Sequence, residues 1–157
     1  MESVEVSQRL EESIQSALEW SYSQQHPEGF WVGQLESNST MEAEWILGMH
    51  FLGIKDDPKK EGVVACIRRM QRPDGSWGVY HEAPSGDLNA TVECYAALRT
   101  SGAAAEEPAL QAARNWILAH GGVASARVFT KIWLALIGEW PWNGTPSLPP
   151  ELIFFPS

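Results

Sequence analysis

Basic side chains are scarce in this sequence. Its 157 residues include 11 lysines and arginines against 20 aspartates and glutamates, which gives a net charge of −9. Binding to nucleic acid needs clustered positive charge that neutralises phosphates. The adjacent basic pairs, Lys59–Lys60 and Arg68–Arg69, are expected to belong to a solvated helix face. The composition therefore predicts that nucleic acid is not a partner.

Long apolar runs and cysteines are also few. No stretch approaches the roughly 18 uninterrupted apolar residues of a membrane-spanning helix, and the acidic first residues lack the apolar core of an export signal. The two cysteines, Cys66 and Cys94, lie within apolar helical patterns and not at the spacing of metal ligands. We therefore expect a cytoplasmic protein with two buried free thiols and no metal site, a disulfide being the less favoured alternative.

Apolar residues make up 44% of the sequence, which is typical of a globular domain. Their spacing predicts six helices of two kinds. Helices with a single apolar face are expected at residues 8–24, 58–71 and 107–119. Helices that are apolar nearly all round are expected at residues 40–52, 89–100 and 126–138.

A helix that is apolar on every side must be enclosed by others. Outer amphipathic helices that alternate with inner enclosed ones predict an all-α fold of three αα-hairpins, about half of a closed α/α toroid. Residues Ser39 to Glu42 form a capping-box pattern, and Asp87 and Ser125 can cap the next two inner helices. The glycines expected near the ends of the inner helices are Gly53, Gly102 and Gly138.

A short motif with the pattern Gln-x-Pro-Asp/Glu-Gly-x-Trp occurs twice, 46 positions apart. The shared residues are Gln25, Gly29 and Trp31 in the first copy and Gln71, Gly75 and Trp77 in the second. Repetition at such a spacing is typical of stacked units. The proline and glycine favour a turn, the tryptophan supplies a large apolar plug, and the glutamine amide can bind exposed backbone groups. A structural role is therefore favoured over contact with a ligand.

Three charged residues, Glu44, Glu93 and Arg127, fall within about two turns of the predicted starts of successive inner helices. Alternate helices in such a stack run parallel, so these starts gather at one end. A structural interpretation is that acids favour helix N-termini and that the arginine neutralises them. A functional interpretation is that a desolvated carboxylate cluster holds a water molecule and accepts a proton. The residues by themselves leave both interpretations open.

Phe129 and Trp133 are four residues apart and share one face of the last inner helix. Core packing is the simpler interpretation, although an aromatic face can also stabilise a carbocation. Arg127 precedes Phe129 by two positions, which places the two residues on opposite sides of a regular helix. We therefore expect Arg127 to reach the charged cluster only from an irregular first turn.

The repeated motif resembles the QW motif of squalene-hopene and oxidosqualene cyclases. The segments around Glu44, Glu93, Arg127 and Trp133 also look like the N-terminal part of a bacterial squalene-hopene cyclase, and the resemblance covers essentially the whole chain. It implies that Glu44, Glu93 and Arg127 belong to a polar patch where ordered water quenches the final cation. It also implies that Phe129 and Trp133 are among the rings that line the cavity.

The sequence has no Asp-x-Asp-Asp motif, whose central acid protonates squalene in the family that this chain resembles. Its last residues, 149–157, resemble a segment after which the family chain continues. We therefore expect residues 1–157 to be an N-terminal fragment that covers about half of the barrel without the acid, and to be inactive alone.

The resemblance implies squalene or a related polyprenoid as the substrate of the full-length chain. It implies no cofactor, because a Brønsted acid starts the reaction. Self-association or docking to a missing C-terminal part is expected, and peripheral membrane association follows from the family only. The alternative is a non-catalytic helical toroid that binds an isoprenoid or a protein partner through its concave face.

Overall fold

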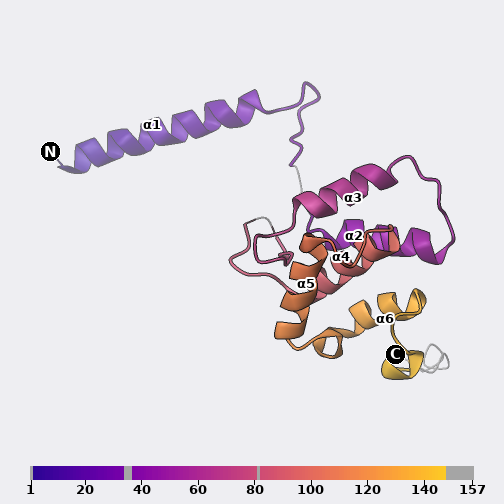
Figure 1. The fold of residues 1–157 in the computed structure, drawn as a ribbon. Coiled ribbons are helices and arrows are strands. Elements are labelled where there is room, and N and C mark those ends of the chain that lie inside the picture. The colour runs from indigo at the N-terminus through magenta and orange to yellow at the C-terminus, as the bar shows by residue number, and fades with distance from the viewer. Residues whose placement is uncertain (1, 34–36, 81, 148–157) are drawn as a thin grey trace, which may run out of the picture. The chain divides into compact units, whose positions relative to one another are not determined.

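The computed structural model describes residues 2–33, 37–80 and 82–147, so the expectation about residues 149–157 lies outside the described residues. The chain divides into two compact units, Met1–Leu35 and Glu36–Ser157, and each is described by itself. The described residues form six α-helices and no β-strand (Figure 1). This confirms the all-α prediction.

The first unit contains helix α1, Glu2–Ser23, followed by the first copy of the repeated motif. The helix begins earlier than the predicted residue 8 because no proline or glycine interrupts its acidic first turns. Its apolar stripe of Leu10, Ile14 and Leu18 is exposed. The pairing of this helix with the next one as a hairpin stays a prediction.

The second unit contains the other five helices, each within three residues of its predicted bounds. They are α2 Thr40–Phe51, α3 Lys60–Arg69, α4 Leu88–Thr100, α5 Pro108–Ala119 and α6 Val128–Leu136. The start of α6 is later than predicted because a short 3-10 turn, Val123–Ser125, comes first. Arg127 then has extended backbone, with φ −63° and ψ 161°, and is not part of the helix.

Helix α4 is the centre of the second unit and contacts α2, α3, α5 and α6 (Figure 1). Eight of its residues are buried, among them the fully buried Leu98. Within this unit α4 is enclosed as expected, whereas Phe51 of α2 and Phe129 of α6 are exposed. Full enclosure of α2 and α6 stays a prediction. Within this unit α4 has helices on several sides, whereas α2 and α6 each leave a face open.

The predicted helix caps hold at one of three positions. The carboxylate of Asp87 accepts a hydrogen bond from the Ala90 N–H at 2.9 Å, as expected for an N-cap. The capping box at Ser39 is wrong, because Ser39 already has helical backbone and its side chain makes no capping bond. Asn38 takes that role instead, since its Oδ1 accepts from the Thr40 N–H at 3.0 Å.

The cap predicted at Ser125 is also wrong. Ser125 lies in the 3-10 turn, and its hydroxyl donates to the Gly121 carbonyl at 3.0 Å. The side chain of Asn89 in α4 instead accepts from the Arg127 N–H at 2.7 Å, so the start of α6 is held by a neighbouring helix. The predicted glycines follow the three inner helices with positive φ, at Gly53, Gly102 and Gly138.

Candidate functional site

The second copy of the repeated motif ties three pieces of the second unit together. The Gln71 amide donates to the Gly75 carbonyl and to the Ala109 carbonyl in the first turn of α5, both at 2.9 Å. The indole N–H of Trp77 donates to the Ile67 carbonyl in α3 at 2.7 Å, and the Trp77 ring is fully buried. The turn, the end of α3 and the start of α5 are thereby joined through polar groups around one large apolar side chain.

The first copy makes the same local hydrogen bonds within the first unit. The Gln25 amide donates to the Gly29 carbonyl at 2.7 Å, and the Trp31 indole donates to the carbonyl of Ser21, ten residues earlier, at 2.6 Å. The tryptophans differ, because Trp31 is 53% exposed. The recurring geometry is therefore local to the motif, while burial of the ring comes from other helices.

Glu93 is the most deeply buried charged side chain of the predicted cluster, with none of its surface exposed. It projects from the middle of α4, and the Nη2 of Arg127 lies 3.3 Å from its Oε1. Arg127 reaches α4 because it precedes the first turn of α6 in extended backbone. Phe129, two residues later, is 69% exposed and does not reach the buried Glu93.

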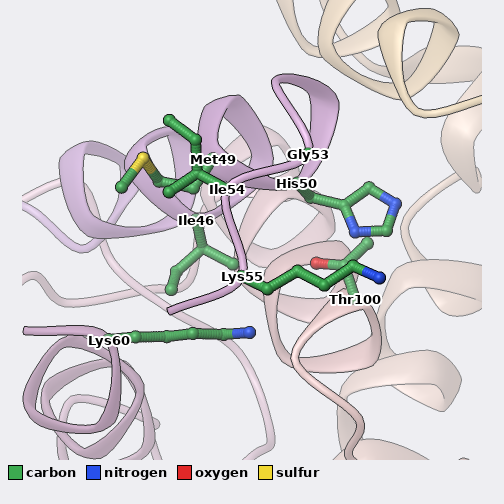
Figure 2. A pocket seen from close by; sticks show the side chains of 8 residues that line it. All are labelled: Ile46, Met49, His50, Gly53, Ile54, Lys55, Lys60 and Thr100. Carbon is green, nitrogen blue, oxygen red and sulfur yellow. The ribbon is translucent and has the colours of Figure 1, made fainter. Parts of the chain in front are cut away.

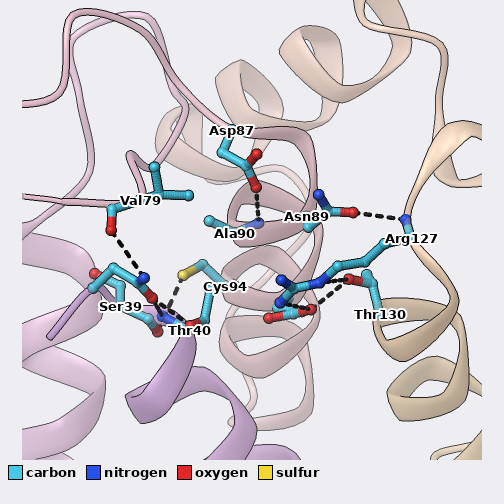
Figure 3. Close-up of polar contacts among 11 residues, drawn as sticks. Ser39, Thr40, Val79, Asp87, Asn89, Ala90, Cys94, Arg127 and Thr130 are labelled. Atoms are coloured by element: carbon cyan, nitrogen blue, oxygen red, sulfur yellow. Dashed lines mark hydrogen bonds and ion pairs between the residues drawn. The ribbon is translucent and has the colours of Figure 1, made fainter.

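A third group, Thr130, completes the buried contact (Figure 3). Its hydroxyl donates to Glu93 Oε1 at 2.5 Å, and the Nε of Arg127 donates to the same hydroxyl at 3.4 Å. We call Glu93, Arg127 and Thr130 the polar cluster. Sequence reasoning missed Thr130 and Asn89, although a threonine within a mostly apolar helix is a usable signal, because a buried hydroxyl needs a hydrogen-bond partner.

Burial raises the pKa of the Glu93 carboxyl above its ordinary value. The hydrogen bond from Thr130 and the charge of Arg127 oppose this rise, whereas the charge of Glu44 adds to it. Glu44 is half-buried in α2, and in the part of the chain that the structure describes no hydrogen bond or ion pair joins it to Glu93 or Arg127. The structure therefore brings Glu93 and Arg127 into contact and places Glu44 within electrostatic range.

The second carboxylate oxygen of Glu93, Oε2, is buried and receives no hydrogen bond from any described residue, and the same holds for Glu42 Oε2. Cys94 lies close by, and burial together with the charges of Glu93 and Glu42 raises the pKa of its thiol. Cys94 is buried and free, as predicted, while Cys66 is free but only half-buried. The polar cluster thus contains one buried carboxylate oxygen that accepts no hydrogen bond, and it belongs to a carboxyl whose pKa is raised.

The two aromatic residues lie in different surroundings. A Cβ placed on Gly48 of α2 would be 3.8 Å from Cη2 of Trp133, so the half-buried indole packs over that glycine and against the core. Phe129 is exposed on the open side of α6. Their predicted part in lining a cavity stays a prediction.

A cavity of about 350 Å³ lies at the C-terminal ends of α2 and α4, where it is lined by Met49, His50, Lys55, Lys60 and Thr100 among others (Figure 2). Its charged lining residues are basic, and none of the predicted site residues lines it. The cavity and the polar cluster are therefore separate features.

Residues 2–33, 37–80 and 82–147 contain no group of three or more side chains suited to hold a metal ion. Over the same ranges no helix has both the length and the apolar character needed to cross a membrane.

The succession of helices and the two turn motifs define an all-α protein built from helical hairpins. Residues 14–157 match the family model described as the squalene-hopene cyclase N-terminal domain. This match covers most of the sequence, and the chain therefore belongs to the squalene-hopene cyclase family.

Individual relatives agree with this assignment. The chain is 42% identical over 142 residues to squalene-hopene cyclase of Alicyclobacillus acidocaldarius, covering 90% of this chain and 22% of that protein. It is 39% identical over 147 residues to dammaradiene synthase of Dryopteris crassirhizoma, with 94% and 21% covered. It is 40% identical over 152 residues to squalene-hopene cyclase of Zymomonas mobilis, with 96% and 23% covered. The chain thus spans about a fifth of the length of these relatives.

Proposed function

We propose that this chain is the N-terminal part of a proton-initiated triterpene cyclase that acts on squalene or a related polyprenoid. It supplies part of the helical scaffold and part of the site where the final cation is quenched. The observation that carries the proposal concerns Glu93 in this member of the family. Its carboxylate is fully buried, and Arg127 and Thr130 contact it through one oxygen only.

The chemistry assigned to Glu93 is the last step of the reaction. A C–H bond next to the cationic carbon breaks, its electron pair forms a carbon–carbon double bond, and the proton passes to Glu93 or to a water molecule that Glu93 holds. If water adds to the cation instead, the product is an alcohol and Glu93 takes the proton that the water loses. The burial that raises the pKa of Glu93 makes it a stronger base than an exposed carboxylate.

The first step needs an acid that this chain does not supply. Unactivated alkenes are very weak bases, and the Asp-x-Asp-Asp motif that would protonate one does not occur in the sequence. We infer that cyclisation requires further chain, docked on the faces that α2 and α6 leave open. Self-association through these faces and peripheral attachment to a membrane belong to the same proposal.

The test compares two preparations. In a full-length chain that carries this region and the catalytic acid, Glu93→Ala is expected to lower total product or to change the product ratio several-fold, measured by gas chromatography after incubation with squalene. Glu139→Ala, which removes an exposed carboxylate, is the control and is expected to leave the products unchanged. The purified 157-residue chain is expected to give no cyclised product.

Two results would overturn the proposal. Hopanoid formation by the 157-residue chain alone would show that the acid lies within it. A full-length Glu93→Ala protein with an unchanged rate and product ratio would reduce Glu93 to a structural residue, and squalene binding without conversion would then favour a non-catalytic binding module.

A further inference from the structure

The hydrogen bonds of the polar cluster have a fixed direction. The Nε of Arg127 can only donate, so the Thr130 hydroxyl acts as acceptor toward Arg127 and keeps its own proton free. That proton points to Glu93 Oε1. The hydrogen bonds therefore run from Arg127 to Thr130 and from Thr130 to Glu93, which is the final acceptor.

The use of this hydroxyl is unusual within the chain. Two threonines in α4, Thr91 and Thr100, donate to carbonyls of their own helix or its cap, at Asp87 and Ala97. Such local bonds are the common arrangement for a helical threonine. Thr130 instead donates across to another helix, and none of its surface is exposed.

The two oxygens of the Glu93 carboxylate are consequently not equivalent. Oε1 accepts from the Thr130 hydroxyl and from Nη2 of Arg127, whereas Oε2 is buried and no described residue donates to it. A proton on Oε1 would point at groups that already donate to that atom. A proton on Oε2 meets no such conflict and leaves Oε1 as the carbonyl oxygen that accepts both bonds.

We propose that Thr130 is a positioning residue that makes Oε2 the proton-accepting oxygen of Glu93. By occupying Oε1, its hydroxyl orients the carboxylate and directs incoming protons to the opposite atom. This inference rests on the proposed function only for its consequence in the reaction, because the choice of oxygen is a property of the folded chain itself.

The direct test is infrared spectroscopy of the 157-residue chain at a pH low enough to protonate Glu93. The Glu93 carbonyl band is identified as the band that is lost in Glu93→Gln. With the proton on Oε2, the carbonyl oxygen is Oε1, and its two hydrogen bonds lower the stretching frequency. Thr130→Val, which keeps the shape of the side chain and removes the hydroxyl, is then expected to raise that frequency.

Two further variants serve as controls for the loss of the hydroxyl. Thr130→Ser retains a hydroxyl and is expected to restore the wild-type band, and Thr100→Val removes a hydroxyl that bonds its own helix and is expected to have no effect. A titration of the Glu93 carboxyl by carbon NMR is expected to give a higher pKa in Thr130→Val than in the wild type and in Thr130→Ser. Circular dichroism checks that each variant is folded.

The inference is overturned if the wild-type band has the high frequency of an unbonded carbonyl, or if Thr130→Val leaves both the band and the pKa unchanged. In a full-length cyclase, Thr130→Val is expected to change the product ratio in the same direction as Glu93→Gln, with Thr130→Ser near wild type. Unchanged products together with the expected infrared shift would reject the proposed function while leaving the positioning of Glu93 by Thr130 established.

Discussion

Glu93 shows what burial does to a single carboxyl. Its side chain is fully buried, and one positive charge and one hydroxyl offset only part of the cost of removing it from water. Its contacts lie 34 and 37 residues along the chain, in the segment that leads into α6 and in α6 itself. The contribution of this carboxyl to the stability of the fold is therefore expected to change with pH in a way that the contribution of an exposed glutamate does not.

Glu93→Gln tests this dependence through stability. Because the pKa of Glu93 is raised from 4.5 in the folded chain, the folded state binds more protons than the unfolded state between the two pKa values. The free energy of unfolding of the wild type is therefore expected to fall, relative to Glu93→Gln, as the pH rises through that window. Urea unfolding at several pH values measures the difference, and parallel pH profiles for the two proteins would contradict it.

At the scale of elements, the repeated motif has the same form in both units but different surroundings. Gly29 and Gly75 have nearly equal positive φ values of 90° and 88°. A Cβ added to Gly75 would lie 2.5 Å from the backbone carbon of Ala112 in α5, whereas one added to Gly29 would have no atom within 4 Å. The backbone conformation requires glycine at both positions, and close approach of a helix requires it at only one.

Gly75→Ala and Gly29→Ala form a matched pair that separates these two requirements. Both substitutions introduce strain at positive φ, at a cost of about 1 kcal/mol or more. Gly75→Ala must also push against the backbone of α5, which adds about 1–3 kcal/mol. Urea unfolding followed by circular dichroism is expected to show the larger loss for Gly75→Ala, and equal losses would mean that contact with α5 does not limit this position.

At the scale of the whole molecule, several large apolar side chains of the second unit are exposed. They include Met41, Phe51, Leu52, Leu118 and Phe129. Scattered apolar residues are normal on a soluble surface, but faces left open on α2 and α6 are typical of surfaces that another protein segment covers. The chain also spans only about a fifth of the length of its relatives.

We expect the purified chain to associate with itself at high concentration. Sedimentation velocity over a range of concentrations is expected to show a rise in mean mass, which Phe129→Gln reduces because it removes an exposed ring from α6. Glu106→Gln, which changes an exposed polar residue, is the control and is expected to behave as the wild type. A monomer at all concentrations would contradict the expectation.

Much of this protein is determined by local sequence. The positions of the helices in the second unit follow from the spacing of apolar residues. The hydrogen bonds of the repeated motif recur because the same residue types stand at the same short separations. The capping errors at Ser39 and Ser125 arose where a side chain from outside the predicted cap, Asn38 or Asn89, supplied the acceptor. The family could be identified from these patterns because they cover most of the chain.

The tertiary structure alone decided which residues act together. Spacing placed Glu44, Glu93 and Arg127 at one end of the helices, but only packing brought Arg127 and Thr130 to one oxygen of Glu93 and left Glu44 at a distance. The physical reason is that local order depends on neighbours within about one or two turns. A buried hydrogen bond instead depends on how three segments approach one another, and no single segment encodes that approach.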